Sequence, residues 1–100
     1  MNLLDLYTPE ELAEKQASFL ERMVELLEED GDVATRARTV GHKLHGTGGN
    51  IGIDENLVQW GLRLQVMVHE GATTDALEDE IERLLPEIRR VLEAAATKRG

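Results

Sequence analysis

Five glycines lie within the 12 residues from Gly41 to Gly52, in a segment that its apolar spacing predicts to be mostly helical. Each glycine inside a helix costs roughly 1 kcal/mol relative to alanine, because glycine loses more backbone freedom on folding. A helix with so many glycines has a steric reason for them. Either a second helix packs closely against this one, or another molecule must reach its backbone.

Apolar residues recur at helical spacing in four stretches of the chain. Thr8 and Glu11 form a capping box at the start of the first stretch, Pro9 suits the first helical position, and Tyr7 and Leu12 are placed for a hydrophobic staple. Pro86 lies inside the last stretch, where the apolar period continues across it and favours one bent helix over two. The predicted helices run from Thr8 to the break at Gly31, from about Asp32 to Ile51, from the turn at Gly52 and Asp54 to Gly71, and from Thr74 or Asp75 to about Thr97.

Four amphipathic helices with short connections predict an all-α, antiparallel, up-down-up-down four-helix bundle. Its 100 residues suffice for one domain with one modest core, spanning residues 1–100. The leading residues Met1–Leu6 include three leucines and are expected to add a short helical turn. The predicted core residues are Phe19, Met23, Val33, Ala37, Val40, Leu44, Thr47, Ile51, Leu57, Trp60, Leu64, Leu77, Ile81, Leu84 and Ile88.

Composition excludes several classes of function. The chain has no cysteine, which excludes disulfides and thiolate metal sites. Its net charge of −9 argues against nucleic acid as a partner. The sequence contains neither a long apolar run nor a secretory signal, so we expect no transmembrane helix and no secretion. A cytoplasmic location fits the absence of cysteine, and we expect a monomer because the predicted helices can bury one another's apolar stripes. Residues 33–53 nevertheless carry +3, and the remainder −12, which suits a site for a small anion or an acidic pocket.

The apolar stripe of the second helix places His42 at its most exposed point. With about 100° per residue, His42 lies roughly 180° from the mean direction of the stripe formed by Val33, Ala37, Val40, Leu44, Thr47 and Ile51. Gly46 and Gly49 fall on the same outward half as His42, whereas Gly48 lies nearer the core, where close helix packing explains it. The outward glycines would leave the imidazole open to a bulky partner.

An exposed imidazole is nucleophilic at neutral pH and can form a covalent phosphoryl intermediate. Arg38, Lys43 and a protonated His45 are near enough in sequence to balance the phosphoryl charge. A metal site built from His42, His45 and His69 is the weaker reading, because no acidic residue lies near on that helix. We therefore predict a phosphoryl acceptor with no metal ligands.

At these residues the sequence resembles the histidine-containing phosphotransfer (HPt) family. The family pattern is a histidine, any residue, leucine, lysine, glycine and a run of small residues ending in glycine. The helix order and the late Leu-Leu-Pro-Glu of residues 84–87 are also similar to the family. The matching segment here reads His42-Lys43-Leu44-His45-Gly46-Thr47-Gly48-Gly49-Asn50-Ile51-Gly52.

The resemblance implies that His42 is phosphorylated, that Gly46 gives access to a receiver domain, and that Gln65 on the following helix orients the histidine. It implies a phosphorelay carrier that exchanges phosphoryl groups with the receiver domains of a hybrid histidine kinase and a response regulator. The receiver would supply Mg²⁺, and the chain itself needs no bound cofactor. There is no phosphate-binding loop for ATP, so the chain is not expected to be a kinase.

One position departs from the family pattern: His45 stands where the family has lysine. A lysine is nearly always charged at neutral pH, whereas a histidine is charged only in part. Two alternative functions stay open. The chain could dock on receivers without transferring phosphate, or it could be a phosphoacceptor of the chemotaxis-kinase type that a separate kinase domain phosphorylates directly.

Overall fold

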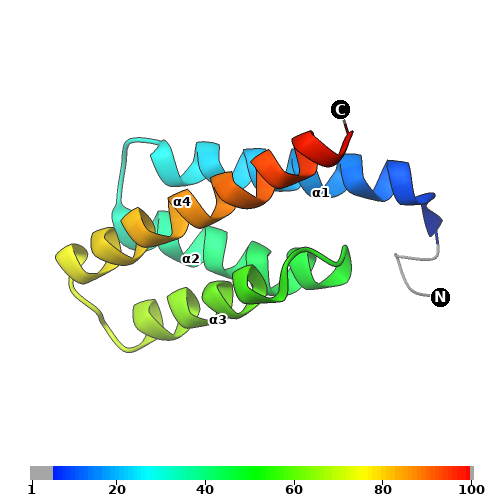
Figure 1. Cartoon of the computed structure of the whole chain (residues 1–100). Helices are drawn as coiled ribbons and strands as arrows, with labels where there is room; N and C mark the ends of the chain where they lie inside the picture. The colour runs from blue at the N-terminus through cyan, green and yellow to red at the C-terminus, as the bar shows by residue number, and fades with distance from the viewer. Residues whose placement is uncertain (1–5, 100) are drawn as a thin grey trace.

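The computed structural model describes residues 6–99, which fold into four α-helices and one π-helical turn (Figure 1). This confirms the all-helical prediction. The predicted N-terminal helical turn lies outside the described residues, which begin at Leu6. The elements are α1 (Pro9–Glu28), α2 (Val33–Lys43), the π-helical turn η2 (Leu44–Gly48), α3 (Glu55–His69) and α4 (Thr74–Arg99).

Side-chain caps explain where the helices begin. The Thr8 hydroxyl accepts a hydrogen bond from the Glu11 N–H, and the Glu11 carboxylate accepts one from the Thr8 N–H, so the predicted capping box is confirmed. The Asp32 carboxylate accepts from the Thr35 N–H at the start of α2, and the Asp54 carboxylate accepts from the Asn56 N–H at the start of α3. At the far end of α3, Gly71 has a φ of +78°, a left-handed conformation that glycine adopts without steric cost.

The core is almost entirely aliphatic and contains most residues of the predicted stripes, although Phe19 and Trp60 are only partly buried against it and Leu20 is buried beside Phe19. Thr47 is exposed, so its predicted place in the core is wrong, and Gly48 is buried instead. The cause is η2, where the backbone widens from the α-helical to the π-helical hydrogen-bonding pattern. The wider turn contains one residue more than an α-helical turn, so Thr47 points outward, while Ile51 remains buried.

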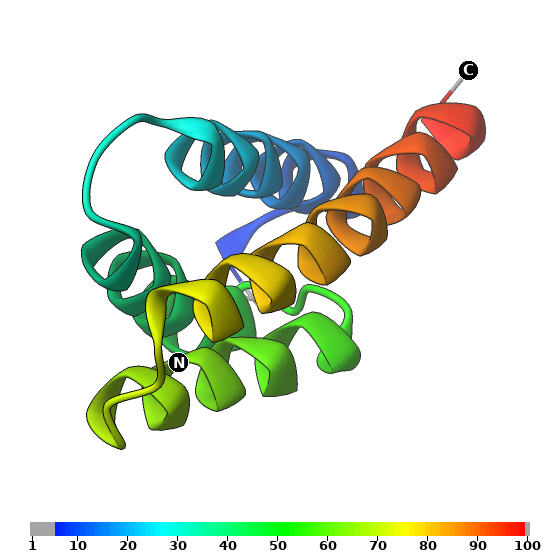
Figure 2. The ribbon, with the colours of Figure 1, turned by 90° about the vertical axis from the view of Figure 1, so that its left-hand side faces the viewer.

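Helices α2 and α3 lie side by side, and α4 packs against α1, α2 and α3 (Figures 1 and 2). Helix α4 continues through Pro86 as one helix, as its apolar period predicted. Arg36 of α2 donates a 2.8 Å hydrogen bond to the carbonyl of Leu27 near the end of α1, so this cation serves the α1–α2 junction. Within residues 6–99, none of the helices combines the length and the apolar character needed to cross a bilayer.

The Asp32 cap gives a pH-dependent contribution to stability. The hydroxyl and the N–H of Thr35 donate to the Asp32 carboxylate and hold its pKa below the ordinary value of 3.8. The ionised cap therefore stabilises the fold above pH 3.8, and this contribution disappears as the pH falls through the lower folded-state pKa. Asparagine caps as well as aspartate but does not titrate.

We expect Asp32→Asn to preserve stability at pH 7 and to flatten the loss of stability below pH 3.8. Urea unfolding of both proteins at a series of pH values measures this difference. Equal loss of stability in the two proteins below pH 3.8 would contradict the role assigned to the Asp32 carboxylate.

Candidate functional site

His42 lies in the last turn of α2 and is exposed, as the helical wheel predicted. The Gln65 side chain of α3 reaches it, and the carboxamide nitrogen lies 3.3 Å from His42 Nδ1. These two residues are 23 positions apart in sequence. The structure therefore brings together the histidine and the glutamine that the family resemblance paired.

A close crossing of α2 and α3 makes this contact possible. A Cβ added to Gly61 would lie 2.8 Å from the Gly41 carbonyl oxygen and 2.8 Å from the His45 backbone nitrogen. A Cβ added to Gly41 would lie 2.8 Å from the Gly61 carbonyl oxygen. The two helices thus touch through backbone atoms, one residue before His42 and four residues before Gln65. Close helix packing explains Gly41, one of the five glycines in the sequence segment.

The Gln65 contact can fix which ring nitrogen of His42 is nucleophilic. A carboxamide can donate through its NH₂ group or, after a half-turn about its terminal bond, accept through its oxygen. When the oxygen accepts, Nδ1 carries the ring proton and Nε2 keeps its lone pair. Since Nδ1 faces Gln65, Nε2 is the nitrogen that a partner could approach.

The remaining glycines of the segment divide into open and packed positions. A Cβ added to Gly46 would meet nothing within 4 Å, and one added to Gly49 would meet only Val58 Cγ1 at 3.8 Å. A Cβ added to Gly48 would lie 2.6 Å from Ile53 Cδ1. The outward positions of Gly46 and Gly49 and the packed position of Gly48 confirm the division made from the helical wheel. The absent side chains at Gly46 and Gly49 leave an open surface beyond His42.

Three basic residues lie close to His42 in the sequence, on α2 and η2. Arg38, Lys43 and His45 are all exposed, and within residues 6–99 neither Arg38 nor Lys43 forms an ion pair. Arg38 and Gln65 line a shallow hollow of about 490 Å³ together with Val68 and His69 of α3. Of the three predicted phosphate-proximal residues, the structure therefore places Arg38 beside the residue that contacts His42.

Sequence reasoning missed two apolar residues on α3. Leu62 and Val66 are 39% and 44% exposed, four residues apart on one face of the helix. Gln65 lies three residues after Leu62 on the same side, so the apolar pair borders the residue that contacts His42. The sequence could have indicated their exposure, because neither residue belongs to the apolar stripe that contains Leu57 and Leu64. Two such residues do not by themselves mark a docking surface, but they add exposed apolar area beside Gln65.

No protein-family model, curated protein or solved structure matches this chain. The functional assignment therefore rests on the residues of the site. In the described part of the chain, no group of three histidine and carboxylate side chains is arranged to hold a metal ion. What the site offers is one accessible imidazole, an amide partner on Nδ1, exposed cations and open backbone at Gly46.

Proposed function

We propose that the chain is an HPt-type phosphorelay carrier that takes a phosphoryl group on His42 from a receiver aspartate and passes it to another. The observation that carries this proposal is the contact between Gln65 and His42 Nδ1, which leaves Nε2 for attack. A structural surface histidine needs neither an oriented ring nor two exposed glycines beside it.

The chemistry balances without a proton leaving the ring. The Nε2 lone pair attacks phosphorus, the Nε2–P bond forms, and the bond between phosphorus and the aspartate oxygen breaks with release of the carboxylate. The positive charge that develops on the imidazole is stabilised once the Gln65 carboxamide turns by a half-turn, so that its oxygen accepts from Nδ1–H. Mg²⁺ held by the receiver stabilises the charge on the transferring group. Lys43, Arg38 and His45 then balance the charge of the phosphohistidine.

The partner is a receiver domain whose phosphorylation pocket is acidic. Residues 33–53 carry +3 within a chain of net charge −9, which favours approach of such a pocket to the His42 end of α2. Leu62 and Val66 supply apolar contact area next to Gln65. We place this carrier in the cytoplasm as a single-domain monomer with an up-down-up-down bundle topology, which the turns at Gly31, Gly52 and Gly71 support.

The direct test is incubation with a phosphorylated receiver domain and Mg²⁺, followed by an assay for acid-labile phosphate on the chain. We expect label on the wild-type protein and none on His42→Gln, because glutamine has no nucleophilic ring nitrogen. Circular dichroism of both proteins controls for folding. Absence of label on the folded wild type with several receivers would favour the docking module. Label that arises only with a kinase domain and ATP would favour the chemotaxis-kinase type.

The histidine at position 45 stands where the family pattern has lysine. We expect His45→Lys to add a permanent positive charge three residues after the phosphohistidine and to lengthen its lifetime at neutral pH relative to the wild type. The rate of phosphate release from the two phosphorylated proteins measures this effect, and equal rates would contradict it.

A further inference from the structure

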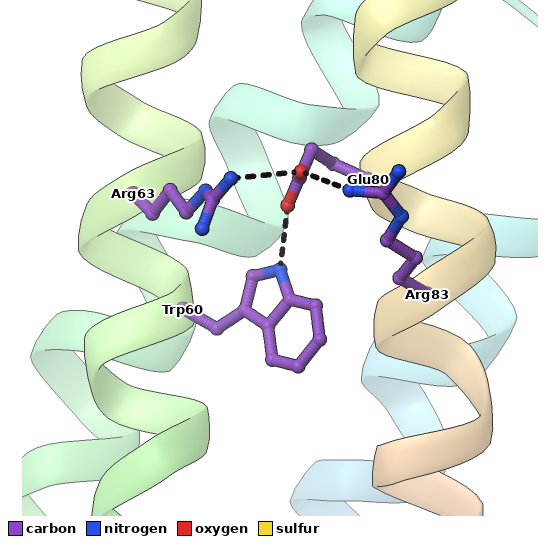
Figure 3. A network of polar contacts seen from close by, with 4 residues as sticks. All are labelled: Trp60, Arg63, Glu80 and Arg83. Atoms are coloured by element: carbon purple, nitrogen blue, oxygen red, sulfur yellow. Dashed lines mark hydrogen bonds and ion pairs between the residues drawn. The ribbon is translucent and has the colours of Figure 1, made fainter.

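Glu80 of α4 is the only charged residue that is buried in the described part of the chain, at 5% exposure. Figure 3 shows its carboxylate between α3 and α4. One carboxylate oxygen accepts from Trp60 Nε1 at 3.1 Å. The other accepts from Arg63 Nη2 at 3.1 Å and from Arg83 Nη1 at 3.3 Å. Two of the three donors belong to α3, so Glu80 links that helix to α4.

Stability alone does not explain a carboxylate at this place. Burying a charge is costly, and apolar residues of similar volume often replace buried ion pairs with equal or greater stability. The side chains of Arg63 and Arg83 are 64% and 68% exposed, so water could solvate both without Glu80. Unlike an apolar residue, Glu80 forms directional hydrogen bonds. These bonds fix the rotation of α3 about its axis and its position along that axis relative to α4.

The rotation of α3 determines whether Gln65 meets His42. Gly61 lets α3 come close to Leu44 Cβ and to the backbone of Gly41 and His45, and Gln65 lies one turn further along α3. Trp60 and Arg63 hold the side of α3 that faces α4. At a helix radius of about 5 to 6 Å, a rotation of about 10° moves a side-chain tip by about 1 Å. A shift of that size would break the 3.3 Å contact between Gln65 and His42, which is already long for a hydrogen bond.

We propose that Glu80 is a positioning residue for the phosphoacceptor. It holds α3, through Trp60 and Arg63, at the rotation that keeps Gln65 against His42 Nδ1. This inference rests on the proposed function for its catalytic consequence, whereas the effect on the His42 ring can be measured without any phosphoryl transfer.

The test uses Glu80→Met, which has a similar volume and cannot accept these hydrogen bonds. We expect it to stay folded in urea unfolding, with a modest loss of stability, because water can solvate the two exposed arginines but the Trp60 N–H loses its acceptor. NMR correlations from the ring protons of His42 to its two nitrogens report where the ring proton resides. We expect the proton distribution to change in the direction that Gln65→Leu produces, and transfer from a phosphorylated receiver to slow by about tenfold.

Two further variants make the result specific. Glu78→Met removes an exposed carboxylate from the same helix and should change neither the His42 ring signals nor the transfer rate. Glu80→Gln retains one acceptor oxygen and should give smaller changes than Glu80→Met. Glu80→Gln also provides a test if the methionine variant does not fold. Unchanged His42 ring signals in a folded Glu80→Met would overturn the positioning role. If the wild type accepts no phosphoryl group, the carrier proposal fails, and the NMR comparison still supports or overturns the role of Glu80.

Discussion

Replacing Gly61 with alanine should lower the free energy of unfolding by about 2 kcal/mol. The added Cβ would lie 2.6 Å from Leu44 Cβ and 2.8 Å from backbone atoms of Gly41 and His45. Backbone atoms cannot rotate away as a side chain can, so α2 and α3 must separate. Overpacking costs about 1 to 3 kcal/mol, and three contacts under 3.0 Å, two of them to backbone, place Gly61 at the upper end of this range. The higher helix propensity of alanine offsets about 1 kcal/mol of that cost, which leaves about 2 kcal/mol.

Thermal and urea unfolding measure this effect, and about 2 kcal/mol corresponds to a melting temperature roughly 8 to 16 °C lower for a domain of this size. The matched control is Gly46→Ala, because a Cβ at Gly46 meets nothing within 4 Å. Gly46→Ala should therefore be neutral or stabilise the fold by up to about 1 kcal/mol. A Gly61→Ala protein within about 0.5 kcal/mol of the wild type would show that the crossing adapts more easily than its backbone contacts indicate.

A larger residue at Gly46 should leave the fold intact and slow phosphoryl transfer, whereas Gly61→Ala should lower stability. Glutamine is a good helix former, so Gly46→Gln should be at least as stable as the wild type. Its side chain would project from the open surface beyond His42 and hold a receiver away from Nε2. Because a misplacement of about 1 Å can cost about a hundredfold in rate, we expect transfer from a phosphorylated receiver to fall by about that factor.

A small phosphodonor separates a blocked surface from a damaged nucleophile. Phosphoramidate needs no docked protein, so Gly46→Gln and the wild type should accept phosphate from it at similar rates. His42→Gln should accept phosphate from neither donor. Equal loss with phosphoramidate and with the receiver would mean that the substitution disturbs the imidazole itself, and the role of Gly46 in partner access would then be wrong.

Much of the fold could be predicted because short-range rules decide where these helices begin and which faces they bury. The capping box at Thr8 and Glu11 and the break at Gly31 follow from local chemistry, and the structure confirms them. Thr47 could not be placed correctly, because a regular period of 3.6 residues was assumed across the whole second helix. Within the widened turn Leu44–Gly48, Gly48 packs against Ile53, a contact that local spacing does not encode.

The candidate site divides in the same way. The exposure of His42 and the outward position of Gly46 depend on the apolar stripe of a single helix, so a helical wheel was enough to predict both. The close approach of Gly41 and Gly61 and the carboxylate of Glu80 involve two helices at once, and spacing along one helix cannot predict them. The pairing of Gln65 with His42 came from family resemblance, and the contact seen here depends on that same helix crossing.

The π-helical turn has a consequence for transplanting this site to another scaffold. Because η2 spans Leu44–Gly48, the residues after it are out of phase with those before it by about one position. A graft of residues 33–51 built as an ideal α-helix would bury Thr47 and turn Gly48 away from Ile53. A designed acceptor helix must therefore carry the wide turn along with the histidine.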